Sequence, residues 1–310
     1  MEPKYKFTGS KKAVYSSDGT RHTVRRIMAL RDIPRHGVKA GDLGGWIEEE
    51  GNLGQDGTDA WVADSAIVFD KAKVTMDALV SGYARVYHFA EVCCSATVTE
   101  RAAVFGVTGE KIGDSDFRSL SCPKITGDAI ISGKAKIYGS NKIYGFARVF
   151  GNAEVFGNAE IFDFARVFGN ARIDGFAKIF ENAEVYGNAY VRASSKVHGS
   201  ARVYGAAEIF GAADVDGGTI CDNVILMDKS HVSGDAALRG HVVMGDKASV
   251  VENSLVGGNV TMMHSAKISI SGDVVGNIRM ILGAELDGWG VVNGDFVIRD
   301  KVYVESEYSG

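Results

Sequence analysis

Proline and cysteine are scarce in this chain, and long apolar runs are missing. The 310 residues include 3 Pro and 4 Cys. No run approaches the roughly 18 apolar residues of a membrane helix, and the opening segment MEPKYKFTGSKK lacks the apolar core of a signal peptide. These features argue against a membrane-spanning or secreted protein, and we expect a cytoplasmic location.

The few cysteines do not form a recognisable site. They are Cys93, Cys94, Cys122 and Cys221, and no CxxC pair is matched by a second one. Structural zinc sites and redox motifs depend on such paired spacing. We therefore expect reduced thiols of a cytosolic protein, and no metal centre.

Charge is unevenly distributed along the chain. The net charge is −5, yet residues 1–39 carry ten Lys or Arg against three Asp or Glu, which leaves 24 basic and 36 acidic residues for the rest. Such a basic head either docks on its own acidic body or meets an anionic partner, and we favour the first. No basic stripe runs along the body, so we do not expect nucleic acid as a partner.

Glycine, in contrast, is abundant, and it follows a repeat of six residues. The chain has 39 Gly. An aliphatic residue recurs at every sixth position from Val62 to Val104, again from Ile131 to Val215, and, after a one-residue slip, from Val232 to Ile298. Ala usually stands two residues earlier, and Arg, Lys or Glu stands between them. Because residues two apart on a strand share a side, each unit reads as a short strand with a buried Ala and Val or Ile, followed by a Gly-Asn corner.

The recurrence of side chains gives the number of units in one turn. Met244, Met262, Met280 and Ile298 stand at the same place in every third unit of the repeat. A solenoid stacks like residues on like residues, so the sequence predicts an all-β, single-stranded parallel β-helix with a triangular cross-section and about 18 residues per turn. We predict a β-rich N-terminal cap at residues 1–55 and a solenoid of about 12 turns at residues 56–310. Residues 105–126 break the repeat and are predicted to form a protruding loop, whose role in binding, catalysis or docking stays open.

Two resemblances add to this interpretation. The order [VI]-x-G-N-A-x resembles the hexapeptide repeat of the left-handed β-helix superfamily, which includes many acyltransferases, whereas a right-handed solenoid of the bactofilin type is the alternative. HTVRRIMAL, VKAGDLGGWIEEEGNLGQDG and the repeat that follows them resemble the YdcK-like β-helix family of enterobacteria and their phages. That family is labelled as transferase by inference from its fold, which is weak evidence for a reaction. The resemblance implies a phage setting and, in that case, a virion-associated location.

Large aromatic residues follow the buried positions. Val149 is predicted to face the core, so Phe150 faces outward, and steps of three units place further rings above it. Two outward columns result, and we take them as a candidate interface: Phe150, Phe168, Tyr186 and Tyr204 in one, and Tyr144, Phe162 and Phe180, followed by His198, in the other. Stacking along the column is one explanation. We favour contact with another copy, in a trimer or a side-by-side dimer, or with another protein, because apolar patches of that size mark interfaces.

An acyltransferase would need a histidine base, and the superfamily resemblance implies a coenzyme A site between subunits. We single out two histidines as having an acidic residue one turn away at the same position of the repeat: His88 has Asp70, and His264 has Asp246. A carboxylate orients an imidazole and raises its basicity. His88 and Asp70 are the candidate catalytic pair, since they lie one turn from residues 105–126.

We therefore expect a non-catalytic β-solenoid that acts as a rigid interaction or structural protein, without a cofactor. The alternative is a coenzyme A-dependent acyltransferase of the hexapeptide-repeat type. A glycan-binding fibre is a third hypothesis, because flat aromatic surfaces can hold sugar rings.

Overall fold

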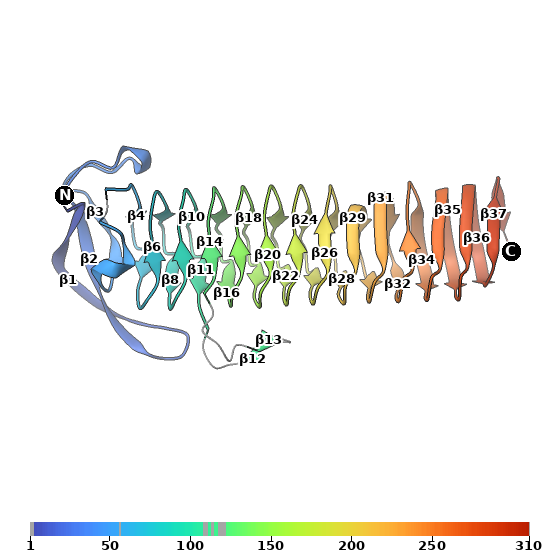
Figure 1. Cartoon of the computed structure of the whole chain (residues 1–310), viewed down its shortest axis with the longest axis horizontal. Coiled ribbons are helices and arrows are strands. Elements are labelled where there is room, and N and C mark those ends of the chain that lie inside the picture. Colours follow the sequence, from blue (N-terminus) through green and yellow to red (C-terminus); the bar gives the residue numbers. More distant parts are fainter. Residues whose placement is uncertain (1–2, 56, 108–110, 113–114, 117–121, 310) are drawn as a thin grey trace. The chain divides into compact units, whose positions relative to one another are not determined.

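A computed structural model describes residues 3–55, 57–107, 111–112, 115–116 and 122–309. The chain is all-β, with 2% helix, and forms a β-solenoid of about 14 turns with about 18 residues between turns (Figure 1). The predicted fold class is confirmed. Within the described residues, no helix has both the length and the apolar character needed to cross a membrane.

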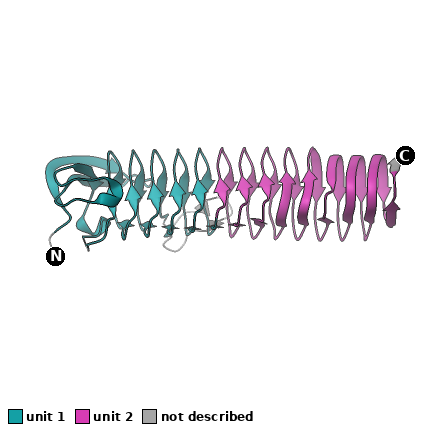
Figure 2. Cartoon of the chain, turned by 90° about the horizontal axis from the view of Figure 1, so that it is seen from above, with its two compact units in different colours: residues 1–163 teal, residues 164–310 magenta. Residues whose placement is uncertain are grey.

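The chain divides into two compact units, residues 1–163 and residues 164–310 (Figure 2). Within the first unit, the predicted cap at residues 1–55 packs against the coil. Val14 and Val24 of the head form one buried cluster with Phe69 and Tyr87 of the coil. The head and the first turns therefore share a core.

The head of the first unit is a small antiparallel sheet. Strand β1 (Tyr5–Tyr15) pairs with β2 (Arg21–Ala29), which pairs with β3 (Leu43–Ile47). Two short 3-10 helices, η1 (Pro34–His36) and η2 (Glu50–Asn52), flank β3. As expected, basic residues of the head contact acidic residues of the coil in the same unit. Arg31 pairs with Asp59 at 3.5 Å, and Arg35 pairs with Asp77 at 3.6 Å.

The coil begins inside the predicted cap. Trp46 and Ile47 of β3 pair in parallel with Ile67 and Val68. Part of the first turn lies before residue 56, where the six-residue repeat is not recognisable in the sequence. This is one reason why the predicted number of turns, about 12, is lower than the observed number, about 14. Each short strand then pairs with the strand three elements later, so three strands make one turn. These strands are β4 (Trp61–Val62), β5 (Ile67–Val68), β6 (Lys73–Val74), β7 (Leu79–Val80), β8 (Arg85–Tyr87), β9 (Glu91–Val92), β10 (Thr97–Val98), β11 (Ala103–Phe105), β14 (Lys124–Ile125), β15 (Ile130–Ile131), β16 (Lys136–Tyr138), β17 (Lys142–Ile143), β18 (Arg148–Val149), β19 (Glu154–Val155) and β20 (Glu160–Ile161).

The interruption of the repeat is shorter than residues 105–126. Phe105 still belongs to β11, and Ile125 of β14 is fully buried and pairs with Val92. Of the predicted loop, residues 108–110, 113–114 and 117–121 lie outside the described residues. Strands β12 (Lys111–Ile112) and β13 (Ser115–Asp116) form an antiparallel pair. The coil resumes in register, because Phe105 lies opposite Tyr138.

The second unit continues with short strands and then changes to long ones. The predicted slip is present: Val215 lies opposite Val232, one position before the partner that the regular spacing would give it. The strands after the last hexad also extend the coil, since β37 and β38 pair with β36. The strands are β21 (Arg166–Val167), β22 (Arg172–Ile173), β23 (Lys178–Ile179), β24 (Glu184–Val185), β25 (Tyr190–Val191), β26 (Lys196–His198), β27 (Arg202–Val203), β28 (Glu208–Ile209), β29 (Asp214–Ile220), β30 (Ile225–Leu226), β31 (His231–Leu238), β32 (His241–Met244), β33 (Ser249–Val250), β34 (Leu255–Met262), β35 (Lys267–Met280), β36 (Glu285–Ile298), β37 (Lys301–Val304) and β38 (Glu307–Ser309).

The core consists of the predicted Ala and Val or Ile positions, which are fully buried, as Ala183 and Val185 illustrate. Burying one Val or Ile side chain contributes roughly 1.5–3 kcal/mol. Glycine corners bring adjacent turns close together. At Gly169, φ is +70°, and an added Cβ would lie 2.9 Å from the backbone nitrogen of Gly187. A side chain at that corner is disfavoured by both the backbone conformation and the close approach of the next turn.

Candidate functional site

An aromatic ladder, with one ring stacked on the next per turn, runs along the second unit. We call Phe168, Tyr186 and Tyr204 the Phe168 ladder. Successive ring centroids lie 4.8 Å apart, with interplanar angles of 5° and 9°. The three side chains are partly exposed, because each directly follows the buried Val of its strand and therefore projects outward.

Charged residues border the Phe168 ladder. The side chain of Arg166 pairs with Glu184 at 2.7 Å, and Arg202 lies 3.7 Å from the other oxygen of Glu184. Arg166 also lies over the ring of Phe168 at 5.4 Å. The ladder thus has a flat apolar strip and an edge on which positive and negative charges alternate from turn to turn.

The other predicted interface residues also lie at outward positions and are partly exposed. In the first unit, Tyr144 and Phe162 are parallel at 4.9 Å, and Phe150 follows the buried Val149. In the second unit, Phe180 stacks on His198 at 4.5 Å. Each predicted stack that lies within one unit is therefore present. Whether these rings contact another chain stays a prediction.

A longer ladder lies in the first unit. Steps of three units predict an outward column of Phe69, Tyr87 and Phe105 and a separate one of Tyr138 and Phe156, but the structure joins the two and buries Phe69 and Phe156. Rings stack from turn to turn at 4.8–5.3 Å, and two of the five side chains are fully buried. The insertion before β14 lies between Phe105 and Tyr138 in sequence, so regular steps of three units cannot connect these two rings. This Phe69 ladder consists of Phe69, Tyr87, Phe105, Tyr138 and Phe156. Its first rings pack under the head, where they are structural.

Four highly exposed rings of the repeat occupy another position. Tyr83 is 65% exposed, Phe146 53%, Phe164 58% and Phe176 63%. Each stands between the positive-φ corner residue and the buried Ala, where several units of the central repeat have Asn. Phe or Tyr in place of this Asn is a sequence signal that could have identified them.

The predicted catalytic pair is in contact. His88 Nδ1 lies 3.1 Å from Asp70 Oδ2, so the two residues meet across adjacent turns as expected. However, His88 is only 8% exposed, and its ring lies 5.0 Å from that of the buried Tyr87. The backbone N–H of Asp70 donates to Glu48, which also pairs with His22 of the head. The pair is part of the junction between head and coil.

The surroundings of this pair fit coenzyme A poorly. A cavity of about 280 Å³ is lined by Lys71 and Phe89, which directly follow Asp70 and His88, but neither member of the pair lines it. Lys71 is paired with Glu49 at 3.1 Å, and Glu49 and Glu91 also line the cavity, so carboxylates adjoin its lysines.

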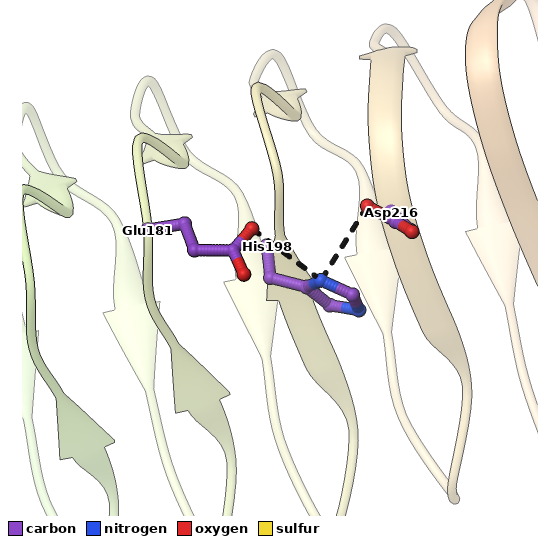
Figure 3. Close-up of side chains that lie close together, drawn as sticks. All are labelled: Glu181, His198 and Asp216. Carbon is purple, nitrogen blue, oxygen red and sulfur yellow. Dashed lines mark ion pairs between the residues drawn. The ribbon is translucent and has the colours of Figure 1, made fainter.

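A different histidine has the densest set of charged neighbours in the described part of the second unit (Figure 3). His198 Nε2 lies 3.0 Å from Asp214 Oδ1, while Nδ1 lies 3.5 Å from Asp216 and 3.8 Å from Glu181. The prediction of an aromatic column included His198 but missed these acids. The signal was present, because Glu181 precedes His198 by about one turn of the repeat and Asp216 follows it by one turn.

The remaining candidates have plain structural explanations. The backbone N–H of His264 donates to Asp246 Oδ2 at 2.9 Å, so this pair forms a corner contact and not a carboxylate–imidazole pair. Burial and the neighbouring Cys94 raise the pKa of Cys93 to about 11. Its thiol is protonated at neutral pH.

Comparison with known proteins adds no relative to this geometry: no family model and no curated protein matches the chain.

Proposed function

We propose that this chain is a non-catalytic β-solenoid that serves as an interaction or structural protein and associates with a second copy of itself through surface aromatic residues. The observation that carries the proposal is the partly exposed Phe168 ladder, with the highly exposed Phe164 and Phe176 in the same unit. Rings of this kind are depleted on monomer surfaces, where apolar area favours association. A phage-associated setting, in the cytoplasm or the virion, rests on the YdcK-like resemblance alone.

A second copy is the partner that fits this surface best. Both copies have the same spacing of about 4.8 Å between rungs, so the rings of one ladder can lie against the rings of the other. The alternation of Arg166 and Glu184 is complementary to itself when a second copy lies antiparallel and offset by one turn, so that Arg166 of each copy faces Glu184 of the other. Such a self-complementary patch is what a two-fold interface requires.

The test is molecular mass in solution, measured by light scattering for the wild type and for Phe168→Asp. We expect an oligomer for the wild type and a shift to monomer for Phe168→Asp, because a carboxylate would be buried without a partner. Tyr83→Asp, at an exposed ring of the first unit, is the matched control and should leave the mass unchanged. A monomeric wild type, or an unchanged mass for a folded Phe168→Asp chain, would refute the proposal.

The acyltransferase alternative has one observation in its favour, the 3.1 Å contact between His88 and Asp70. Calorimetry with acetyl-coenzyme A separates the two functions. A scaffold protein shows no heat of binding. An enzyme shows saturable binding and a turnover that His88→Gln abolishes.

A further inference from the structure

We propose that Glu181, His198 and Asp216 form a site for a divalent transition-metal ion of the zinc type. Three consecutive turns of the second unit supply these residues (Figure 3). His198 ends β26 and lies opposite Asp216 of β29 in the parallel register. Glu181 lies one turn earlier, and the backbone N–H of Gly199 fixes its carboxylate with a hydrogen bond of 2.7 Å.

The distances between the ligand atoms suit an ion at their centre. One atom from each residue lies within 4.8 Å of the other two. The separations of 3.5 and 3.8 Å from His198 Nδ1 to the carboxylate oxygens are too long for good hydrogen bonds. They are close to the edge of a tetrahedron around zinc, about 3.4 Å for bonds of about 2.1 Å.

The orientation of the imidazole is fixed before any ion binds. Phe180 stacks on the ring at 4.5 Å with an interplanar angle of 6°. Asp214 accepts a hydrogen bond from Nε2 at 3.0 Å, which places the proton of the neutral ring on that nitrogen. The lone pair of Nδ1 then points toward the carboxylates of Glu181 and Asp216. A carboxylate behind a ligating histidine is the usual outer partner in metal sites.

A lone pair that faces carboxylates is unfavourable unless a cation lies between them. Asp216 has its ion pair with His198, and no Lys or Arg of the described residues pairs with this carboxylate. A metal ion at this place satisfies the lone pair of Nδ1 and both carboxylates together. One imidazole nitrogen with two carboxylate oxygens is a donor set that zinc and its neighbours accept, with water completing the coordination.

Zinc titration of the full-length chain by isothermal calorimetry tests the site, in comparison with His198→Phe. Phe keeps an aromatic ring on Phe180 and removes the ligand nitrogen. We expect the wild type to bind one more equivalent of zinc than this variant, so any zinc held by the native cysteines cancels. Asp216→Asn should lose the same equivalent, and Asp214→Asn should weaken binding about 10–100-fold. His241→Phe, at an exposed histidine of β32, is the control and should bind as the wild type does.

A second readout does not depend on the variants. In the wild type, zinc should shift the imidazole 15N resonance of His198 Nδ1 and raise the midpoint of thermal unfolding, because the ion binds only the folded coil. Equal zinc stoichiometry in the wild type and His198→Phe would overturn the proposal. So would a His198 spectrum that responds to pH and not to zinc, since the occupant would then be a proton only.

Discussion

At the scale of single residues, the corner of each turn decides which side chains the coil tolerates. Most corners have Gly, yet Glu181 and Ala193 occupy the same position with φ of 57° and 60°. A non-glycine residue pays roughly 1–2 kcal/mol for the left-handed conformation. Glu181 gains the contact with Gly199 and lies beside His198, whereas the exposed methyl group of Ala193 brings no comparable contact.

Ala193→Gly should therefore stabilise the second unit, and Gly187→Ala should destabilise it. We expect a gain of about 0.5–1 kcal/mol for the first, after subtracting the larger unfolded-state entropy of Gly. For Gly187, φ is +70° and an added Cβ would lie 2.9 Å from the nitrogen of Gly205, so a loss of about 2 kcal/mol or more is expected. Urea denaturation of both variants checks the pair. If both substitutions changed the free energy of unfolding by the same amount and in the same direction, the left-handed conformation at these two corners would be contradicted.

Tyr190 gives the second unit a sensitivity to alkaline pH. Its hydroxyl donates to Asp174 at 3.2 Å, and burial, followed by the charge of Asp174, raises its pKa to about 12. An unfolded tyrosine ionises near pH 10. Between about pH 10 and 12 the unfolded state therefore releases its proton first, and stability falls as pH rises.

Tyr190→Phe should make the decline of the urea midpoint between about pH 10 and 12 shallower than in the wild type. Loss of the hydrogen bond to Asp174 also lowers the urea midpoint of Tyr190→Phe at neutral pH. The quantity to compare is therefore the slope of the urea midpoint against pH, and not the midpoint itself. Tyr83→Phe, at an exposed ring, is the control. An identical slope for Tyr190→Phe and the wild type would contradict the assignment.

At the scale of elements, two-residue strands gain their stability from stacking between turns. Tyr186 lies between Phe168 and Tyr204 and contacts both rings. Each stacked pair contributes about 0.5–1.5 kcal/mol beyond burial. We expect Tyr186→Ala to destabilise the second unit by about 1–3 kcal/mol, twice the value of one pair, and Tyr83→Ala to cost less than about 0.5 kcal/mol. Thermal and urea unfolding measure both. Equal costs would mean that the ladder contributes nothing to folding.

The sequence predicted these elements where the repeat was unbroken. The buried Ala and Val positions, the slip near Val215 and the stacks within each unit follow from a strict period of two along the strand and of three hexads along the coil. Two features escaped, for a common reason. The insertion removed the regular spacing between Phe105 and Tyr138, and Trp46 is separated from its partner Ile67 by more than one regular turn. Where the period changes, pairing is decided by contacts distant in sequence, which periodicity cannot show.

The candidate site was less predictable than the fold. The contact between His88 and Asp70 was foreseen, but its burial at the junction with the head depends on how β1 and β2 fold back on the coil. The Glu181, His198 and Asp216 group was overlooked because its members differ in their position within the repeat. Glu181 replaces a corner glycine, and His198 and Asp216 directly follow buried valines.

At the scale of the whole molecule, one quantity supports the ladders, the metal site and the proposed interface alike: the length of each turn, about 18 residues. Asn170 and Asn188 are one turn apart, and their side chains share a hydrogen bond of 3.2 Å. Asn182 lies at a different corner of the coil, two hexads after Asn170. Adjacent strands lie about 4.8 Å apart, which is within the Cα distance that a disulfide bridges.

The most direct measurement is therefore disulfide formation in two double variants, with the four native cysteines replaced by serine. Asn170→Cys/Asn188→Cys should oxidise to an intramolecular disulfide, detected by mass spectrometry of the digested chain, without lowering the midpoint of thermal unfolding. Asn170→Cys/Asn182→Cys should stay reduced under the same conditions. Rapid oxidation of the second pair in place of the first would contradict a turn of three hexads and, with it, the alignment of every ladder and ligand described above.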